Sequence, residues 1–118
     1  MYSIEFYENK NGKSEVYDYI QKLSINKENR KKLKKIYLYF DLLSEHGLNL
    51  KEPYIKKLTK NIWELRPFMD RILFACWHNN KFIILSVYTK KTQKTPKLEI
   101  KKAENLFKDY KERCDENE

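Results

Sequence analysis

The chain contains little glycine, proline, cysteine or histidine. Two glycines and three prolines in 118 residues exclude disorder over most of the length. Cys76 and Cys114 are isolated, with neither a metal-ligand spacing nor a disulfide framework, which is typical of a protein from a reducing compartment. The two histidines, His46 and His78, have no partner at a spacing that suits a metal site or a triad. Two glycines are also too few for a phosphate loop, so we expect neither metal nor cofactor.

Long hydrophobic runs are also absent. No apolar stretch approaches the roughly 18 residues that a membrane span needs. The start, Met1 to Glu5, lacks the basic region and apolar core of a signal peptide. We therefore expect a cytoplasmic protein with no membrane contact. The length predicts a single domain over residues 1–118, with a polar tail over about 111–118 that frays.

What the chain has in excess is positive charge, with a formal net charge of +8. Residues 51–101 hold twelve Lys and Arg against four Asp and Glu, a surplus as large as that of the whole chain. Cations release counterions from phosphates, and aromatic rings stack on unpaired bases. This segment combines both, which favours nucleic-acid binding, although charge alone is explained equally well by solubility. Its aromatic residues include Tyr54, Trp63, Phe68, Trp77 and Tyr88.

Periodicity predicts helices on either side of a strand-rich segment. Residues 2–7 alternate as a strand does, and Ser14 is a good N-cap for a short helix. A second helix is expected from about Asn26 to a stop at Gly47. A last helix is expected to begin at Thr95, with its hydroxyl as the cap and Pro96 at the first position. The expected apolar positions are Val16, Ile20 and Leu23, then Leu33, Ile36, Tyr37, Phe40 and Leu43, and finally Ile100, Ala103, Leu106 and Phe107.

Between the helices, a short strand is expected at 55–58, followed by two hairpins. Residues 62–66 alternate, and the turn-like residues 67–70 lead into a β-rich run over 71–78. A tight turn places Arg66 opposite Arg71, with Glu64 on the same face. Because two like charges facing each other are unfavourable, we expect Glu64 or an external anion between them. The chain is thus predicted to be α+β: an N-terminal strand, a two-helix hairpin packed on a mainly antiparallel sheet, and a C-terminal helix.

The second hairpin extends the polar patch. A two-residue turn at Asn79-Asn80 would pair Arg71 with Tyr88 and Leu73 with Ser86. One face, expected to be a surface patch, then carries Glu64, Arg66, Arg71, Ser86, Tyr88 and Lys90. The other face, expected to be covered by helices, carries Trp63, Leu65, Ile72, Phe74, Cys76, Ile83, Leu85 and Val87.

These side chains suit cleavage of RNA by its own 2′-hydroxyl group. Such chemistry needs a base, cations that neutralise the phosphorane, and an acid for the departing 5′-oxygen. Glu64 is the candidate base, and Arg66 and Arg71 form an electrostatic clamp. The acid or further charge stabiliser is one of Tyr88, Lys90 and Lys91, and the predicted RNA-binding residues are Lys57, Lys60, Lys94 and Lys97. The alternative for Glu64 and Arg66 is a surface cross-strand pair with no catalytic role.

Several segments resemble a known family. Trp63-Glu64-Leu65-Arg66, Arg71-Ile72-Leu73-Phe74 and residues 90–96, Lys-Lys-Thr-Gln-Lys-Thr-Pro, look like the signature of the phage-derived, Gp49-like HigB branch of the RelE/ParE superfamily of type II toxins. Lys57-Leu58 before the tetrad, and Glu99, Ile100 and Ala103 after it, also fit. The segment at 90–96 is the most specific part. The resemblance covers nearly the whole chain.

The resemblance implies a ribosome-dependent mRNA endonuclease of RelE-like fold, neutralised by a HigA-type helix-turn-helix antitoxin. It also implies that toxin and antitoxin together repress their operon, so that operator DNA is met only through the complex. Glu64 and Arg71 occupy positions that related toxins use in catalysis, and Lys90 and Lys91 lie where further active-site residues are placed. This chain departs from relatives that have a histidine there.

Two other classes of function fit the same residues. ParE-type relatives inhibit gyrase without cutting RNA, and a simple RNA-binding or DNA-binding accessory protein would also need a basic surface. The sequence does not separate these from the nuclease.

Overall fold

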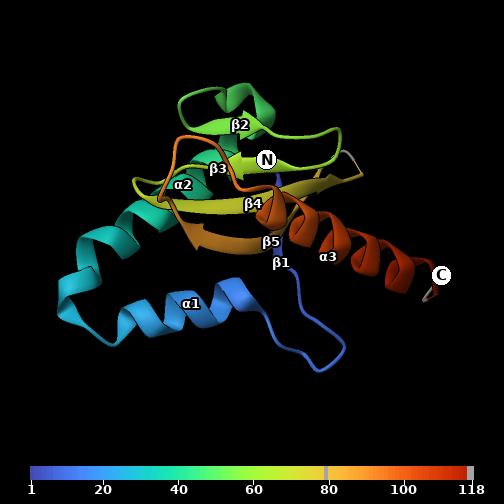
Figure 1. The fold of residues 1–118 in the computed structure, drawn as a ribbon, viewed down its shortest axis with the longest axis horizontal. Coiled ribbons are helices and arrows are strands. Elements are labelled where there is room, and N and C mark those ends of the chain that lie inside the picture. The colour runs from blue at the N-terminus through green and yellow to red at the C-terminus, as the bar shows by residue number, and fades with distance from the viewer. Residues whose placement is uncertain (79, 117–118) are drawn as a thin grey trace.

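The computed structural model describes residues 1–78 and 80–116 (Figure 1). One five-stranded sheet has the order β1-β5-β4-β3-β2, in which β1 is parallel to β5 and the other neighbours are antiparallel. The predicted α+β fold with a mainly antiparallel sheet is confirmed. Along the chain the elements are β1 (Ser3–Phe6), α1 (Glu15–Ser24), η1 (Lys27–Asn29), α2 (Arg30–His46), η2 (Gly47–Leu50), β2 (Ile55–Lys57), β3 (Trp63–Leu65), β4 (Asp70–Trp77), β5 (Lys81–Thr89) and α3 (Lys97–Glu116).

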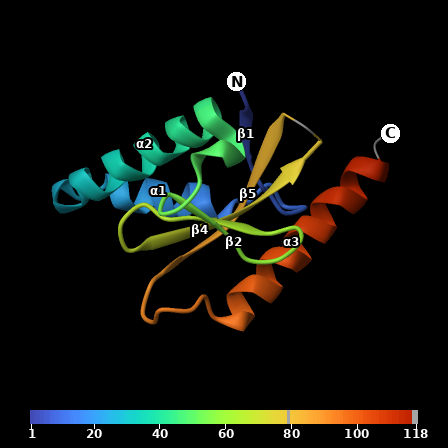
Figure 2. The ribbon, with the colours of Figure 1, turned by 90° about the horizontal axis from the view of Figure 1, so that it is seen from above.

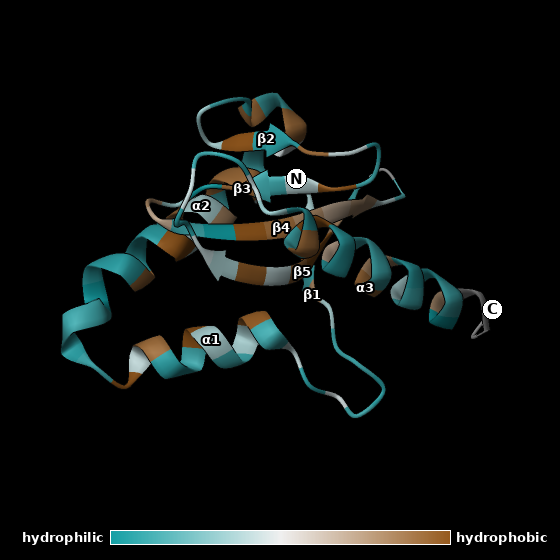
Figure 3. Ribbon diagram, in the orientation of Figure 1, coloured by the Kyte–Doolittle hydropathy of each residue, from teal (hydrophilic) through white to brown (hydrophobic). Residues whose placement is uncertain are grey.

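Helices cover both faces of the sheet. Figure 2 shows α1 and α2 together on one side and α3 on the other. The core under α1 and α2 contains Leu65, Ile72 and Phe74, whereas the core under α3 contains Leu73 and Ala75. This alternation along β4 follows from the period of two in a strand. In Figure 3, β4 is hydrophilic at its start and hydrophobic along its middle, so the polar groups gather at one end of the sheet.

A β-bulge changes which residues of β5 face which layer. Arg71 pairs with Tyr88 and Leu73 with Ser86, as predicted, but Phe74 then pairs with Ile84, so one extra residue of β5 lies in between. An extra residue reverses the alternation beyond it. Ile83 and Leu85 were predicted on the face with Phe74, and this was wrong: they are buried under α3. The predicted turn at Asn79-Asn80 includes Asn79, which lies outside the described residues.

Both N-terminal helices form near the predicted places. Ser14 caps α1 by accepting from the Tyr17 amide at 3.1 Å, and the predicted apolar positions of α1 are buried. The 3-10 turn η1 precedes α2, and Gly47 ends α2 with a φ of 60°. Tyr37, predicted on the buried stripe of α2, is 47% exposed and lies outside it.

The last helix begins later than predicted. It starts at Lys97, and the Thr95 hydroxyl donates to Glu64 instead of capping the helix. Ala103 and Phe107 are buried as predicted, and Tyr110 continues this stripe. α3 runs to Glu116, so the predicted tail is helical as far as that residue, while residues 117–118 lie outside the described part and the fraying from about residue 111 stays a prediction. None of the described helices is both long and apolar enough to cross a membrane.

Gly47 offers a test of the packing between α2 and β1. A Cβ atom at this position would lie 2.5 Å from the Tyr2 ring, which itself stacks against Phe82. We expect Gly47→Ala to lower the free energy of unfolding by about 2 kcal/mol, from positive-φ strain plus the clash. Urea denaturation measures the loss. Gly12→Ala is the matched control, because Gly12 also has positive φ but nothing within 4 Å of the added atom. Equal losses in the two variants would contradict the clash.

Candidate functional site

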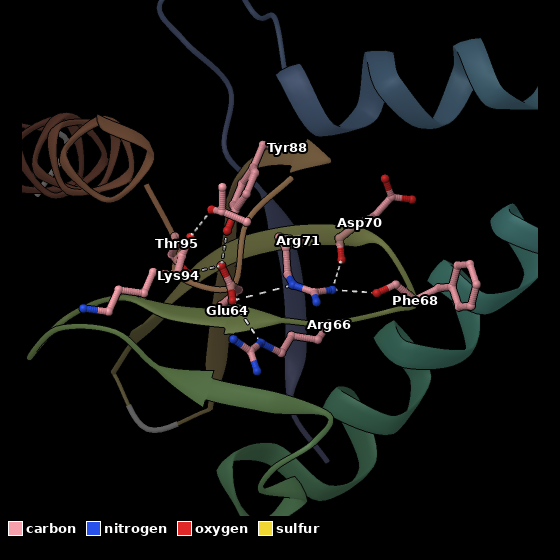
Figure 4. Close-up of polar contacts among 9 residues, drawn as sticks. Glu64, Arg66, Phe68, Asp70, Arg71, Tyr88, Lys94 and Thr95 are labelled. Carbon is pink, nitrogen blue, oxygen red and sulfur yellow. Dashed lines mark hydrogen bonds and ion pairs between the residues drawn. The ribbon is translucent and has the colours of Figure 1, made fainter. Parts of the chain in front are cut away.

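Four of the predicted site residues come together at one end of the sheet (Figure 4). Glu64 lies on β3, Arg66 directly follows this strand, Arg71 is the second residue of β4, and Tyr88 lies near the end of β5. The pairing of Leu65 with Ile72 places Arg66 beside Arg71. The register predicted for this part of the hairpin is therefore confirmed.

The Glu64 carboxylate is the centre of the cluster. Its Oε1 accepts a hydrogen bond from Arg66 Nε at 3.0 Å and lies 3.9 Å from Arg71 Nε. Its Oε2 accepts from the hydroxyl groups of Tyr88 and Thr95, both at 2.8 Å. Glu64 thus lies between the two guanidinium groups, as the repulsion between them predicts.

Glu64 is completely buried, which corrects the prediction of a surface patch. The Tyr88 and Thr95 side chains and the two arginines surround its oxygens. The alternative for Glu64 and Arg66, a pair with no catalytic role, stays a prediction, but the pair is not on the surface as that alternative assumed. A buried carboxylate is tolerated only where charges and donors compensate its desolvation, and here four groups do so.

The two arginines differ in how firmly they are held. Arg71 Nη1 donates to the carbonyl oxygens of Phe68 at 2.6 Å and Asp70 at 3.1 Å, so its side chain also braces the β3–β4 turn. Its side chain is 10% exposed, against 21% for Arg66. Arg66 is therefore the more accessible cation for an anionic ligand, and Arg71 is the more rigid one.

Tyr88 is held as a protonated hydroxyl. Burial of the ring, together with the hydrogen bond to Glu64 and its negative charge, raises the pKa of Tyr88 to about 12, against the lowering effects of Thr95 and Arg71. A neutral phenol beside the carboxylate can donate a proton but is not ionised at neutral pH. Of the three predicted acids, Tyr88 is the one whose side chain contacts Glu64.

Among the described residues, the predicted lysines make no hydrogen bond or ion pair to the Glu64 carboxylate, whose partners are Arg66, Arg71, Tyr88 and Thr95. Lys90 is half-buried, and its amide donates to the Met69 carbonyl, while the next residue, Lys91, is exposed. Lys57 is exposed on β2, with its Nζ 5.6 Å from the Trp63 ring centroid. The side chains of Lys60, Lys94 and Lys97 are also exposed. Because Trp63 packs in the core under α1 and α2, Lys57 lies on the face of the sheet opposite Glu64, and none of these lysines belongs to the contact shell of the carboxylate.

The sequence interpretation missed two parts of the site. Thr95 was assigned only as a helix cap, because a donor to a carboxylate 31 residues away leaves no local pattern. Asp70 was treated as a turn residue, yet it is completely buried. Its Oδ1 accepts from the Tyr19 hydroxyl at 2.7 Å and lies 3.5 Å from Lys32 Nζ. Asp70 therefore fixes α1 and α2 to the strand that carries Arg71.

The cluster has the chemistry of an anion site and not of a metal centre. Within residues 1–78 and 80–116, no three His, Cys, Asp or Glu side chains gather as a metal site would require. Two guanidinium groups, a phenol and a threonine hydroxyl share one carboxylate. Such a group can bind a phosphodiester and move a proton beside it.

Comparison with known proteins identifies the class. The family described as Phage derived protein Gp49-like (DUF891) matches residues 18–108, and the chain belongs to this family. This is a family of RelE/HigB-like toxins and is associated with RNase toxins. A search of the curated proteins finds no match.

Replacement of Glu64 tests its role in stability. We expect Glu64→Gln to lower the free energy of unfolding by about 3 kcal/mol, because an amide cannot balance the buried guanidinium charge of Arg71 and the partly buried one of Arg66. Urea denaturation of the purified protein measures the change. Glu5→Gln is the control, since it weakens a partly exposed pair with Lys81 and should cost under about 1 kcal/mol. A loss for Glu64→Gln no larger than the control would refute the buried network.

The raised pKa of Tyr88 predicts that the protein loses stability at alkaline pH. Its folded pKa of about 12 lies above the ordinary value of 10.0, so the folded state favours the protonated phenol. This stabilisation is complete below pH 10.0 and is lost as the pH rises through about 12. We expect the stability difference between wild type and Tyr88→Phe to shrink over this range in urea titrations. Tyr37→Phe controls for removal of a distant hydroxyl. A difference that does not change with pH would contradict the assignment.

Proposed function

We propose that the protein is the toxin of a type II toxin-antitoxin module and an endoribonuclease that cuts mRNA on the ribosome. The observation that carries the proposal is one buried carboxylate shared by two guanidinium groups and a protonated tyrosine. This is the set that metal-independent cleavage of a phosphodiester needs. Membership of a family associated with RNase toxins supports the same conclusion.

In the proposed reaction Glu64 and Tyr88 work as a pair. Glu64 Oε2 takes the proton of the 2′-hydroxyl, whose oxygen attacks phosphorus. The bond from phosphorus to the 5′-oxygen breaks, and Tyr88 gives its proton to that oxygen. The proton on Glu64 then returns to Tyr88 through their 2.8 Å hydrogen bond. The products are a 2′,3′-cyclic phosphate and a free 5′-hydroxyl, and both side chains end as they began.

The arginines and lysines have the electrostatic roles. Arg66 and Arg71 would neutralise the charge that develops on the non-bridging oxygens of the phosphorane. Lys90 and Lys91 lie close along the chain to Tyr88 and would add positive charge. Lys57, Lys60, Lys94 and Lys97 would contact the RNA backbone further away.

The Thr95 hydroxyl must leave Glu64 before the reaction. It occupies Oε2, the oxygen that the 2′-hydroxyl would approach. Thr95 belongs to the connection between β5 and α3, whose neighbouring residues from Lys91 to Lys94 are exposed. Binding of an RNA phosphate by these residues would displace Thr95 and open the carboxylate. The ribosome would supply this ordered substrate.

The proposed partners follow from the same module. A HigA-type helix-turn-helix antitoxin would neutralise the toxin, and operator DNA would be bound only through their complex. The reaction requires mRNA and ribosomes, both of which are cytoplasmic. No metal or other cofactor takes part in the proposed steps.

Arg66→Ala tests the clamp, and urea denaturation of the variant shows that it is folded in the assay, because Arg66 also compensates the buried charge of Glu64. We expect the rate of cleavage of a translated message to fall about a hundredfold, as one transition-state contact is lost. Primer extension measures the cuts. Arg113→Ala, on the distant end of α3, is the control and should keep full activity.

The same assay separates the rival function. A ParE-type inhibitor would stop DNA supercoiling by gyrase and leave the translated message intact. If the wild-type protein does this, the nuclease proposal is wrong. Arg71→Ala should abolish cleavage and growth arrest while the antitoxin still binds.

A further inference from the structure

A basic cleft lies beyond Arg71 from Glu64, and the cluster at Glu64 does not explain it. It has a volume of about 490 Å³ and lies between the start of α2 and the β3–β4 turn. In Figure 4, Phe68 lies on the far side of Arg71 from Glu64, next to α2. The cleft is lined by Glu28, Asn29, Lys31, Lys32, Lys35, Phe68 and Met69.

Phe68 is held in an unusual and exposed position. Phe68 is 71% exposed, and its φ is 59°, a backbone conformation that bulky residues rarely adopt. The Arg71 guanidinium binds its carbonyl at 2.6 Å and so maintains this conformation. Strain of this kind persists only where neighbouring groups enforce it, and such positions gather at ligand sites. Here the enforcing group is an arginine of the candidate active site.

The lysines of the cleft have different partners. The side chain of Tyr19, and then the charge of Asp70 3.5 Å away, raise the pKa of Lys32 against the lowering effect of burial. Lys35 lies over the Phe68 ring, 5.7 Å from its centroid, and is exposed. Lys31 is also exposed. Three lysines against Glu28 leave the cleft positively charged.

We propose that this cleft binds single-stranded RNA. An unpaired base stacks on Phe68, and Lys31 and Lys35 contact the flanking phosphates. The cleft then holds a nucleotide next to the one that reaches Arg66 and Glu64. An acidic protein segment would also match the charge, but an exposed ring that is fixed by Arg71 favours a base continuous with the cleaved strand. This inference rests on the proposed function for its substrate.

Binding of an uncleavable RNA tests the inference separately from catalysis. The probe is a fluorescein-labelled 2′-fluoro single-stranded RNA of about 12 nucleotides, which lacks the attacking hydroxyl. Fluorescence anisotropy with the whole protein gives the affinity as a function of salt. We expect Phe68→Ala to weaken binding about tenfold and Phe68→Trp to retain it. Lys31→Ala/Lys35→Ala should weaken binding and reduce the slope of log affinity against log salt by about 1.4.

Lys101→Ala/Lys108→Ala is the matched control, because it removes the same charge from exposed positions of α3. An equal loss in this control, or unchanged RNA affinity in the Phe68 and Lys31/Lys35 variants, overturns the inference. So does a Lys31/Lys35 variant that keeps its RNA affinity but loses a co-expressed helix-turn-helix antitoxin, since the cleft is then a protein-binding surface. The two proposals can fail separately. If only the Phe68 and Lys31/Lys35 variants lose RNA affinity, but the wild-type protein cuts no translated message, RNA binding at the cleft is supported and the nuclease proposal is refuted.

Discussion

The structure depends on the cost of burying the Glu64 carboxylate. An ionised group out of contact with water is tolerated only when other charges and donors replace that water. Arg66, Arg71, Tyr88 and Thr95 do so here, and they come from four different segments of the chain. The single carboxylate therefore ties three strands of the sheet to the segment that leads into α3.

The same contacts explain why the site is at once rigid and closed. Both carboxylate oxygens are engaged, so the groups that would transfer protons in the proposed reaction are already aligned without a substrate. Thr95 covers the oxygen that a substrate hydroxyl would need. In the proposed reaction, the hydrogen bond from Thr95 stabilises the resting site, and its replacement by the RNA hydroxyl at Glu64 activates the site.

Arg71 connects the site with its surroundings on the other side. It approaches Glu64 through Nε and fixes the Phe68 and Asp70 carbonyls through Nη1. Asp70 in turn binds Tyr19 and Lys32, so α1 and α2 are attached to the same strand. The cleft at Phe68 and the cluster at Glu64 are thus connected by hydrogen bonds and ion pairs through Arg71.

Local patterns predicted much of this arrangement. The alternation around Glu64, the turn at residues 67–70 and the Ser14 cap each depend on neighbours in sequence, and the structure has them where predicted. The position of Glu64 between the arginines followed from the repulsion of like charges. What failed depended on distant contacts. The bulge opposite Leu73 and Phe74 moved Ile83 and Leu85 to the other face, and Thr95 bonds a carboxylate on another strand. The burial of Glu64 and Asp70 likewise has no signature in a short window of sequence.

The chemistry of the cut ends is the most direct test of the central claim, that the cluster at Glu64 cleaves RNA through its own 2′-hydroxyl. A translated message is incubated with the protein, and the 3′-end of the upstream fragment is analysed by mass spectrometry. The account predicts a 2′,3′-cyclic phosphate, with a 5′-hydroxyl on the downstream fragment. A 3′-hydroxyl paired with a 5′-phosphate would contradict it, because that product requires attack by water and not by the ribose.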